Sequence, residues 1–175
     1  MHTESVKLIE RNGITVYQER SGKVYWNQES NEHVVMLANR AGYFILIKQL
    51  RKAVDSVVIQ LPGGKVERGE SIEMAVRREL VEETGYECGA VYYLGKMYPA
   101  SWRCNEIAHV FYTDEVLTRS EQRLDNDEQI EVLEIEVAQC LQQIRDNELQ
   151  DSELTFAVLQ AGLRGFISKE FSNLF

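Results

Sequence analysis

Residues 64–86 read Gly64-Lys-Val-Glu-Arg-Gly-Glu-Ser-Ile-Glu-Met-Ala-Val-Arg-Arg-Glu-Leu-Val-Glu-Glu-Thr-Gly-Tyr86. Ser71 can cap the start of a helix, and Gly85 stands where a left-handed residue commonly ends one. Apolar residues between them recur at helical spacing and offer one face to a core, namely Ile72, Val76 and Leu80. The stretch therefore predicts a glycine-rich loop followed by a helix from Ser71 to Thr84.

Glu79, Glu82 and Glu83 share one face of this predicted helix. Because a helix turns by about 100° per residue, Glu82 and Glu83 lie roughly 60° and 40° to either side of Glu79. Like charges at this spacing weaken a helix by a few tenths of a kcal/mol per pair. The cluster is either an ordinary solvated acidic face or a site for divalent cations. The repulsion between its like charges favours the second interpretation.

The loop and helix together resemble the signature of the Nudix hydrolase superfamily, G-x5-E-x7-R-E-U-x-E-E-x-G-U, where U is a bulky aliphatic residue. The residues that match in register are Gly64, Glu70, Arg78, Glu79, Leu80, Glu82, Glu83 and Gly85. Tyr86 departs from the pattern at the last position, which packs rather than reacts. The resemblance implies hydrolysis, with Mg²⁺ or Mn²⁺, of the pyrophosphate in a nucleoside diphosphate linked to another group.

The resemblance also assigns roles within the stretch. It implies carboxylate ligands from the helix and a carbonyl ligand from the loop, giving the metal set Gly63, Glu79, Glu82 and Glu83. Hard oxygen donors of this kind suit Mg²⁺. Glu79 and Glu83 rank ahead of Glu82, and Glu70 is expected to orient the others. Arg78 lies four residues before Glu82 and can hold that carboxylate in place.

Two further segments resemble the ADP-ribose pyrophosphatase branch of the superfamily. The run Ile47–Arg51 is similar to the Q-Y-R segment upstream of the signature, so Arg51 is a candidate to bind phosphate, or else a surface arginine. Residues 98–106 are similar to F-Y-x-S-P-G-x-x-x-E and place Glu106 in a substrate-binding position. The proline of this pattern, which marks the branch, does not stand at the matching position in this chain. Trp102 is a candidate to stack on the base, or else packs.

The resemblance to this branch implies a general base from an acidic loop late in the domain. Residues 123–132 contain such a run, and Glu128 best fits the branch's D/E-x-I-E-V pattern. Asp125 and Asp127 are alternatives, and a solvated charge run is the other interpretation of the segment. A base on a loop can close over its substrate.

The composition of the chain limits the size of the protein and the classes of partner that it can bind. The 175 residues are about the size of one domain, and 44% are hydrophobic. A net charge of −9 argues against a nucleic-acid polymer as partner, although a bound cation would still permit an anionic small-molecule nucleotide.

The chain has no apolar run of membrane-spanning length and no signal-like start, which favours a cytoplasmic protein without a membrane partner. Three scattered cysteines suggest neither disulfides nor a zinc site.

The order of predicted elements is strands, one helix, more strands and two closing helices, the last over residues 151–170. This order favours an α+β fold, and the resemblance specifies a Nudix-type α/β/α sandwich with a mixed sheet between helices. We expect an N-terminal strand and hairpin extension over residues 1–32 and the hydrolase domain over residues 33–175. By analogy with the branch, the extension is expected to form a homodimer. The competing hypotheses are another substrate (a nucleoside triphosphate, dinucleoside polyphosphate or NADH) and a noncatalytic nucleotide-sensing module.

Overall fold

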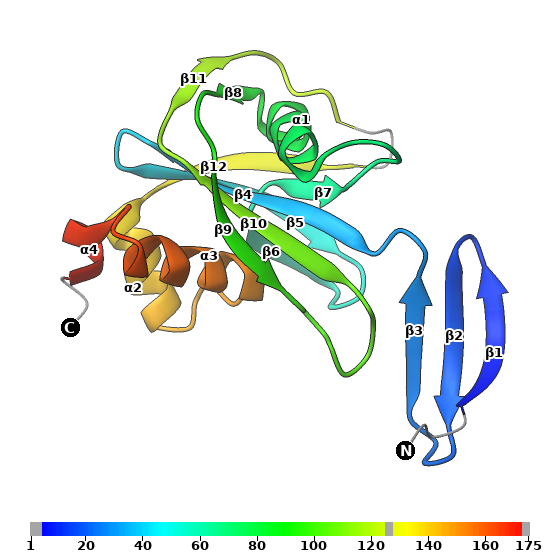
Figure 1. The fold of residues 1–175 in the computed structure, drawn as a ribbon. Coiled ribbons are helices and arrows are strands. Elements are labelled where there is room, and N and C mark those ends of the chain that lie inside the picture. Colours follow the sequence, from blue (N-terminus) through cyan, green and yellow to red (C-terminus); the bar gives the residue numbers. More distant parts are fainter. Residues whose placement is uncertain (1–4, 125–127, 173–175) are drawn as a thin grey trace.

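The computed structural model describes residues 5–124 and 128–172. The chain begins with an antiparallel sheet made of β1 (Ser5–Arg11), β2 (Ile14–Glu19) and β3 (Val24–Gln28). Asn12 and Gly13, in the turn between β1 and β2, both have positive φ, which suits a two-residue hairpin turn. Figure 1 shows this sheet standing to one side of the body of the molecule.

The body is built around a larger mixed sheet. In the described part of the chain its strands are β4 (Glu32–Arg40), β5 (Tyr43–Arg51), β6 (Ser56–Gln60), β7 (Gly63–Lys65), β9 (Tyr92–Met97), β10 (Ile107–Thr113) and β12 (Ile130–Glu136). Strand β10 runs parallel to β4, whereas the other pairings are antiparallel. A small separate sheet pairs β8 (Tyr86–Cys88) with β11 (Val116–Arg119).

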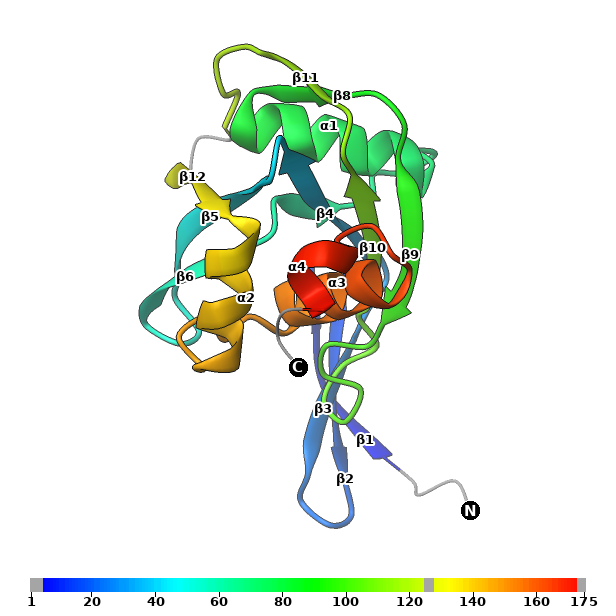
Figure 2. The same cartoon turned by 90° about the vertical axis from the view of Figure 1, so that its left-hand side faces the viewer.

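Helices cover both faces of the larger sheet, as Figures 1 and 2 show from two sides. Helix α1 (Ile72–Thr84) packs on one face, and α2 (Val137–Arg145) and α3 (Ser152–Leu163) pack on the other, followed by the short α4 (Ser168–Ser172). Each face therefore has its own hydrophobic core. The predicted α+β sandwich with a mixed sheet between helices is confirmed. None of the described helices is long and apolar enough to cross a membrane.

Two predictions about elements were wrong in part. The last helix does not continue over residues 151–170: it ends at Leu163, the chain turns at Gly165 with φ 86°, and α4 begins at Ser168. Glycine adopts this left-handed conformation without steric cost, which interrupts the helix. The glycine-rich loop also begins as a strand, because Gly63 and Gly64 pair with β4.

The larger sheet splits between β4 and β5. These strands pair with each other only at their hairpin end, Ala38–Arg40 against Tyr43–Ile45. Farther along, β5 pairs with β6 and β4 pairs with β7. The two strands thus separate, and the gap between them lies open to side chains from both faces of the sheet.

Candidate active site

A cavity of about 1430 Å³ occupies this split. Its lining brings together most of the residues singled out in the sequence: Arg51, Gly63, Arg78, Glu79, Glu82, Glu83, Glu106 and Glu128. Trp102 instead lines a second cavity of about 670 Å³ beside the N-terminal sheet, where its side chain is 76% exposed. The chain therefore gathers residues that are far apart in the sequence, but it leaves Trp102 away from the three glutamates.

Helix α1 presents its glutamates to the cavity because both of its ends are fixed. The Ser71 hydroxyl accepts a hydrogen bond from the Met74 N–H at 3.2 Å, and Gly85 ends the helix with φ 77°. Val76 and Leu80 are fully buried against the sheet. Glu83 and Glu79 lie only about 20° and about 60° around the helix from Val76, so the packing that fixes this face also directs these two carboxylates into the split.

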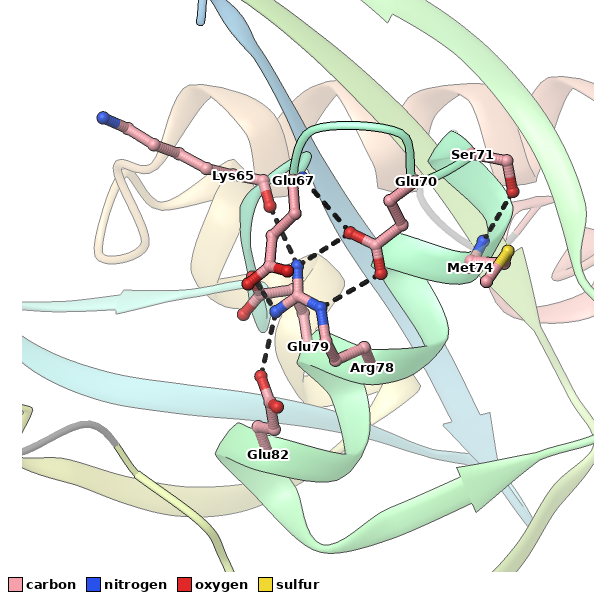
Figure 3. Close-up of polar contacts among 8 residues, drawn as sticks. All are labelled: Lys65, Glu67, Glu70, Ser71, Met74, Arg78, Glu79 and Glu82. Carbon is pink, nitrogen blue, oxygen red and sulfur yellow. Dashed lines mark hydrogen bonds and ion pairs between the residues drawn. The ribbon is translucent and has the colours of Figure 1, made fainter.

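Arg78 is the centre of the polar network in Figure 3. Its guanidinium donates to both carboxylate oxygens of Glu70 at 3.1 Å, in the forked geometry that arginine favours. One nitrogen, Nη1, also donates to Glu79 Oε1 at 2.8 Å and Glu82 Oε2 at 2.9 Å. These contacts raise the pKa of Arg78 and lower the pKa of Glu70. The predicted Arg78–Glu82 contact is therefore present, as part of a wider network.

Glu83 lies deepest of the three glutamates, with 3% of its surface exposed. Its Oε2 accepts a hydrogen bond from the Gly63 N–H at 2.6 Å. Burial, opposed by the Gly63 bond and reinforced by the charges of Glu79 and Glu128, raises the pKa of Glu83 to about 8. Burial likewise raises the pKa of Glu79. The site thus holds carboxylates in a place that disfavours their negative charge.

The residues at this wall fit a divalent cation by their chemistry. Glu79, Glu82 and Glu83 offer hard oxygen donors, and a cation would offset the burial and the neighbouring carboxylates that raise the pKa of Glu83. Gly64 has no side chain, and an added Cβ would lie 2.5 Å from Glu79 Oε1. Among the described residues, however, acidic, His and Cys side chains do not already converge as a ligand cluster. The glutamates instead face Arg78 and Gly63, so holding a cation requires their side chains to turn.

The segment after β11 is attached to the end of α1. Ser120 N–H donates to the Gly85 carbonyl at 2.8 Å, and Arg123 N–H donates to the Glu82 carbonyl at 2.8 Å. Gln122 also donates to the Glu83 carbonyl. Glu128, farther along the chain, also lines the cavity. The alternative bases Asp125 and Asp127 lie outside the described residues.

Sequence reasoning named only Glu106 in the wall of the cavity formed on the other face of the sheet and missed the other residues there. His33 of β4, and Asp151 and Glu153 at the start of α3, line the cavity there. These residues come from distant segments, and a lone histidine or a helix-capping aspartate gives no local signal of a site. Arg123 also lines the cavity. It had a detectable signal, because it is a cation within an otherwise acidic run.

The model of the NUDIX domain matches residues 30–156. This chain belongs to the Nudix family. An ADP-ribose pyrophosphatase of Bacillus subtilis is 34% identical over 71% of this chain and 68% of its own length. A GDP-mannose pyrophosphatase of Klebsiella pneumoniae is 32% identical over 93% of this chain and 84% of its own length. A crystal structure of an ADP compounds hydrolase superposes with a TM-score of 0.76 at 18% identity, over 95% of this chain and 93% of that one.

The structure explains how this Nudix hydrolase accommodates Tyr86 at the aliphatic position of its signature. Tyr86 is 3% exposed and belongs to the core under α1. Its hydroxyl donates to Glu134 Oε1 at 2.6 Å, and the guanidinium groups of Arg40 and Arg119 lie over its ring. A buried tyrosine hydroxyl needs such a partner. The residue therefore packs as predicted, with its polar end satisfied at the edge of the core.

Proposed function

We propose that this Nudix hydrolase cleaves the pyrophosphate of ADP-ribose or a related nucleotide sugar and releases a nucleoside monophosphate and a sugar phosphate. The observation that carries the proposal is the cavity in the split sheet. It is lined by Glu79, Glu82 and Glu83 of α1 and has, beyond them, enough volume for both halves of such a substrate. Ligand pockets commonly measure roughly 300–1,000 Å³, so 1430 Å³ exceeds what a pyrophosphate group needs.

The proposal assigns the residues of the cavity to metal binding, to orientation of the carboxylates and to general-base catalysis. Glu79 and Glu83, with Glu82 and the Gly63 carbonyl, would hold Mg²⁺ or Mn²⁺, and Arg78 orients Glu79 and Glu82. When bound, the cation would neutralise charge on the phosphate oxygens and would lower the pKa of an attacking water. Glu128 is the proposed general base, since its segment is attached to the end of the same helix.

Arg51 is proposed to bind the phosphates between the two walls of the cavity. Its charge acts on Glu83 at one wall and on His33 and Asp151 at the other, so it lies within electrostatic reach of both. Its Nε donates to Gln60 Oε1 at 2.8 Å, which fixes the side chain at the end of β5. The remaining guanidinium nitrogens are suited to phosphate oxygens.

A substrate panel tests the reaction. With Mg²⁺ or Mn²⁺ present, we expect ADP-ribose or GDP-mannose to yield products from which a phosphatase releases phosphate, because the intact substrates have no terminal phosphate. NADH and nucleoside triphosphates complete the panel. Rapid cleavage of triphosphates with no turnover of either nucleotide sugar would contradict the proposed substrate. Tight binding without turnover of any compound would identify a noncatalytic module.

We further propose that residues 1–32 form a dimerisation element. Directly opposed residues share a face of a sheet, and the register places Ile9, Val16 and Trp26 side by side on one face of β1–β3. Val6 and Ile9 remain 65% and 55% exposed there. An exposed apolar sheet face favours an interface. In a dimer, Trp102, which lies beside this sheet, would be available to the substrate of the other copy.

Dimerisation is measured by light scattering during size-exclusion chromatography. We expect the protein to elute with twice the mass of one chain, and Ile9→Glu to shift it to the monomer, because a charge on this face cannot be buried at low cost. Thr15→Glu is the matched control, since Thr15 lies on the opposite face of the same sheet. A monomeric parent protein would refute the interface.

A further inference from the structure

His33 joins three separate elements at the wall of the cavity opposite α1. It lies on β4, its Nε2 is 2.7 Å from Glu153 Oε1 of α3, and its Nδ1 is 3.5 Å from Glu106 Oε1, just before β10. Nδ1 is buried and has no hydrogen bond, so Glu106 is within ion-pair distance without being bonded. A single imidazole thus stands between two carboxylates that line the same cavity.

The surroundings of His33 favour its charged form. Burial of the side chain lowers the pKa, but the hydrogen bond to Glu153 and the charges of Glu153 and Glu106 outweigh burial and raise the pKa above its usual 6.5. Arg51 of β5 is the opposing cation. Asp151, which also lines this wall, accepts a hydrogen bond from Leu154 N–H at the start of α3. The two carboxylates therefore stabilise the imidazolium more than burial and the charge of one arginine destabilise it.

We propose that His33 is a positioning residue, whose positive charge holds Glu106 and the start of α3 as the substrate-binding wall of the cavity. The inference rests on the proposed function and names a residue that sets the affinity for the substrate rather than the rate of bond cleavage. The separation of roles follows from the fold, because the three proposed carboxylate ligands come from α1 on one face of the sheet. His33, Glu106 and Glu153 approach the split from the α3 side.

The wall also indicates the chemistry that it receives. Carboxylates such as Glu106 and Glu153 accept hydrogen bonds but repel phosphate, so this wall suits the hydroxyl groups of an uncharged sugar. Loss of the imidazolium leaves two neighbouring carboxylates without their shared partner. They then separate, and the hydroxyl acceptors lose their position.

The test compares His33→Gln with His109→Gln. His109 is the matched control, because it is a second histidine on the larger sheet with polar partners, Glu32 Oε1 and the Tyr93 hydroxyl each at 3.0 Å, and it is not part of the cavity lining. We expect His33→Gln to raise KM for the nucleotide sugar about tenfold, the scale of one charge-assisted hydrogen bond, with kcat changed less than about twofold. His109→Gln is expected to leave both constants near those of the parent protein.

The pH dependence separates positioning from simple structural support. Because the pKa of His33 is raised in the folded protein, its contribution is present at low pH and is lost as pH rises through that pKa. The parent KM should therefore rise with pH relative to that of His33→Gln, and the two should converge at alkaline pH. Glu153→Gln should reproduce the higher KM. If His33→Gln lowers only thermal stability, or follows His109→Gln in both constants, the positioning role is overturned.

A measurement that does not depend on enzymatic activity distinguishes this inference from the proposed function. In hydrogen exchange at pH 6.5, backbone amides in residues 98–106 and 148–154 should exchange faster in His33→Gln than in His109→Gln. Unchanged exchange would overturn the inference even if the parent enzyme is active. An inactive parent protein with faster exchange in His33→Gln would refute the proposed substrate and leave the structural link established.

Discussion

Glu83→Gln is expected to reduce kcat by on the order of 10³-fold at saturating Mg²⁺ while the protein stays folded. The removed carboxylate is the most buried member of the α1 cluster. Metal-assisted charge stabilisation amounts to several kcal/mol, and each 1.36 kcal/mol corresponds to a factor of about ten in rate. Glutamine keeps an oxygen that can still accept the Gly63 N–H, so the contact between α1 and β7 persists.

Two measurements check the Glu83 prediction. Steady-state assays give kcat, and thermal unfolding with and without Mg²⁺ reports binding, because a ligand of the native state raises Tm. We expect Mg²⁺ to stabilise the parent protein much more than Glu83→Gln. Glu73→Gln is the matched control, because Glu73 is on the same helix but pairs with Arg77 instead of lining the cavity. Full activity in Glu83→Gln would show that the metal-site assignment is wrong.

Gly63→Ala is expected to destabilise the fold by about 3 kcal/mol, the upper end of the usual cost of overpacking. An added Cβ would lie 2.0 Å from the Val34 carbonyl oxygen and 2.8 Å from Val35 Cα. Both are backbone atoms of β4, which is held on its other side by β10, so they cannot move aside cheaply. The pairing of β7 with β4 should break, and denaturation in urea should show the loss at an otherwise similar slope.

Two other glycines serve as controls for Gly63. At Gly64 the added Cβ would meet the Glu79 carboxylate, whose side chain can turn away. Gly64→Ala should therefore reduce activity more than stability. At Gly42 the space is open and φ is 88°, so alanine there costs only the left-handed strain of about 1 kcal/mol. Equal stability losses at Gly63 and Gly42 would show that close packing against β4 is not what requires Gly63.

The sequence predicted the parts of the site that are local in the chain. Ser71, Gly85 and the buried Leu80 fix where α1 begins, where it ends and how it turns, and these features alone place three glutamates together. Strand β7 was missed because Gly63 and Gly64 have no side chains to show an alternating pattern. The pair of His33 and Glu153 was missed because 120 residues separate them, and only the packing of α3 on the sheet brings them together.

The split between β4 and β5 has a consequence for how such an enzyme can diversify. One contiguous segment, residues 63–85, supplies the α1 wall of the cavity, whereas the opposite wall is assembled from β4, the residues before β10 and the start of α3. Substitutions in that second wall do not alter the helix that carries the glutamates. Mutational libraries confined to residues 148–153 should therefore change substrate preference while preserving the capacity to break pyrophosphates. Because the gap in the sheet separates the two walls, substrate recognition can change during evolution while the residues that cleave the pyrophosphate stay the same.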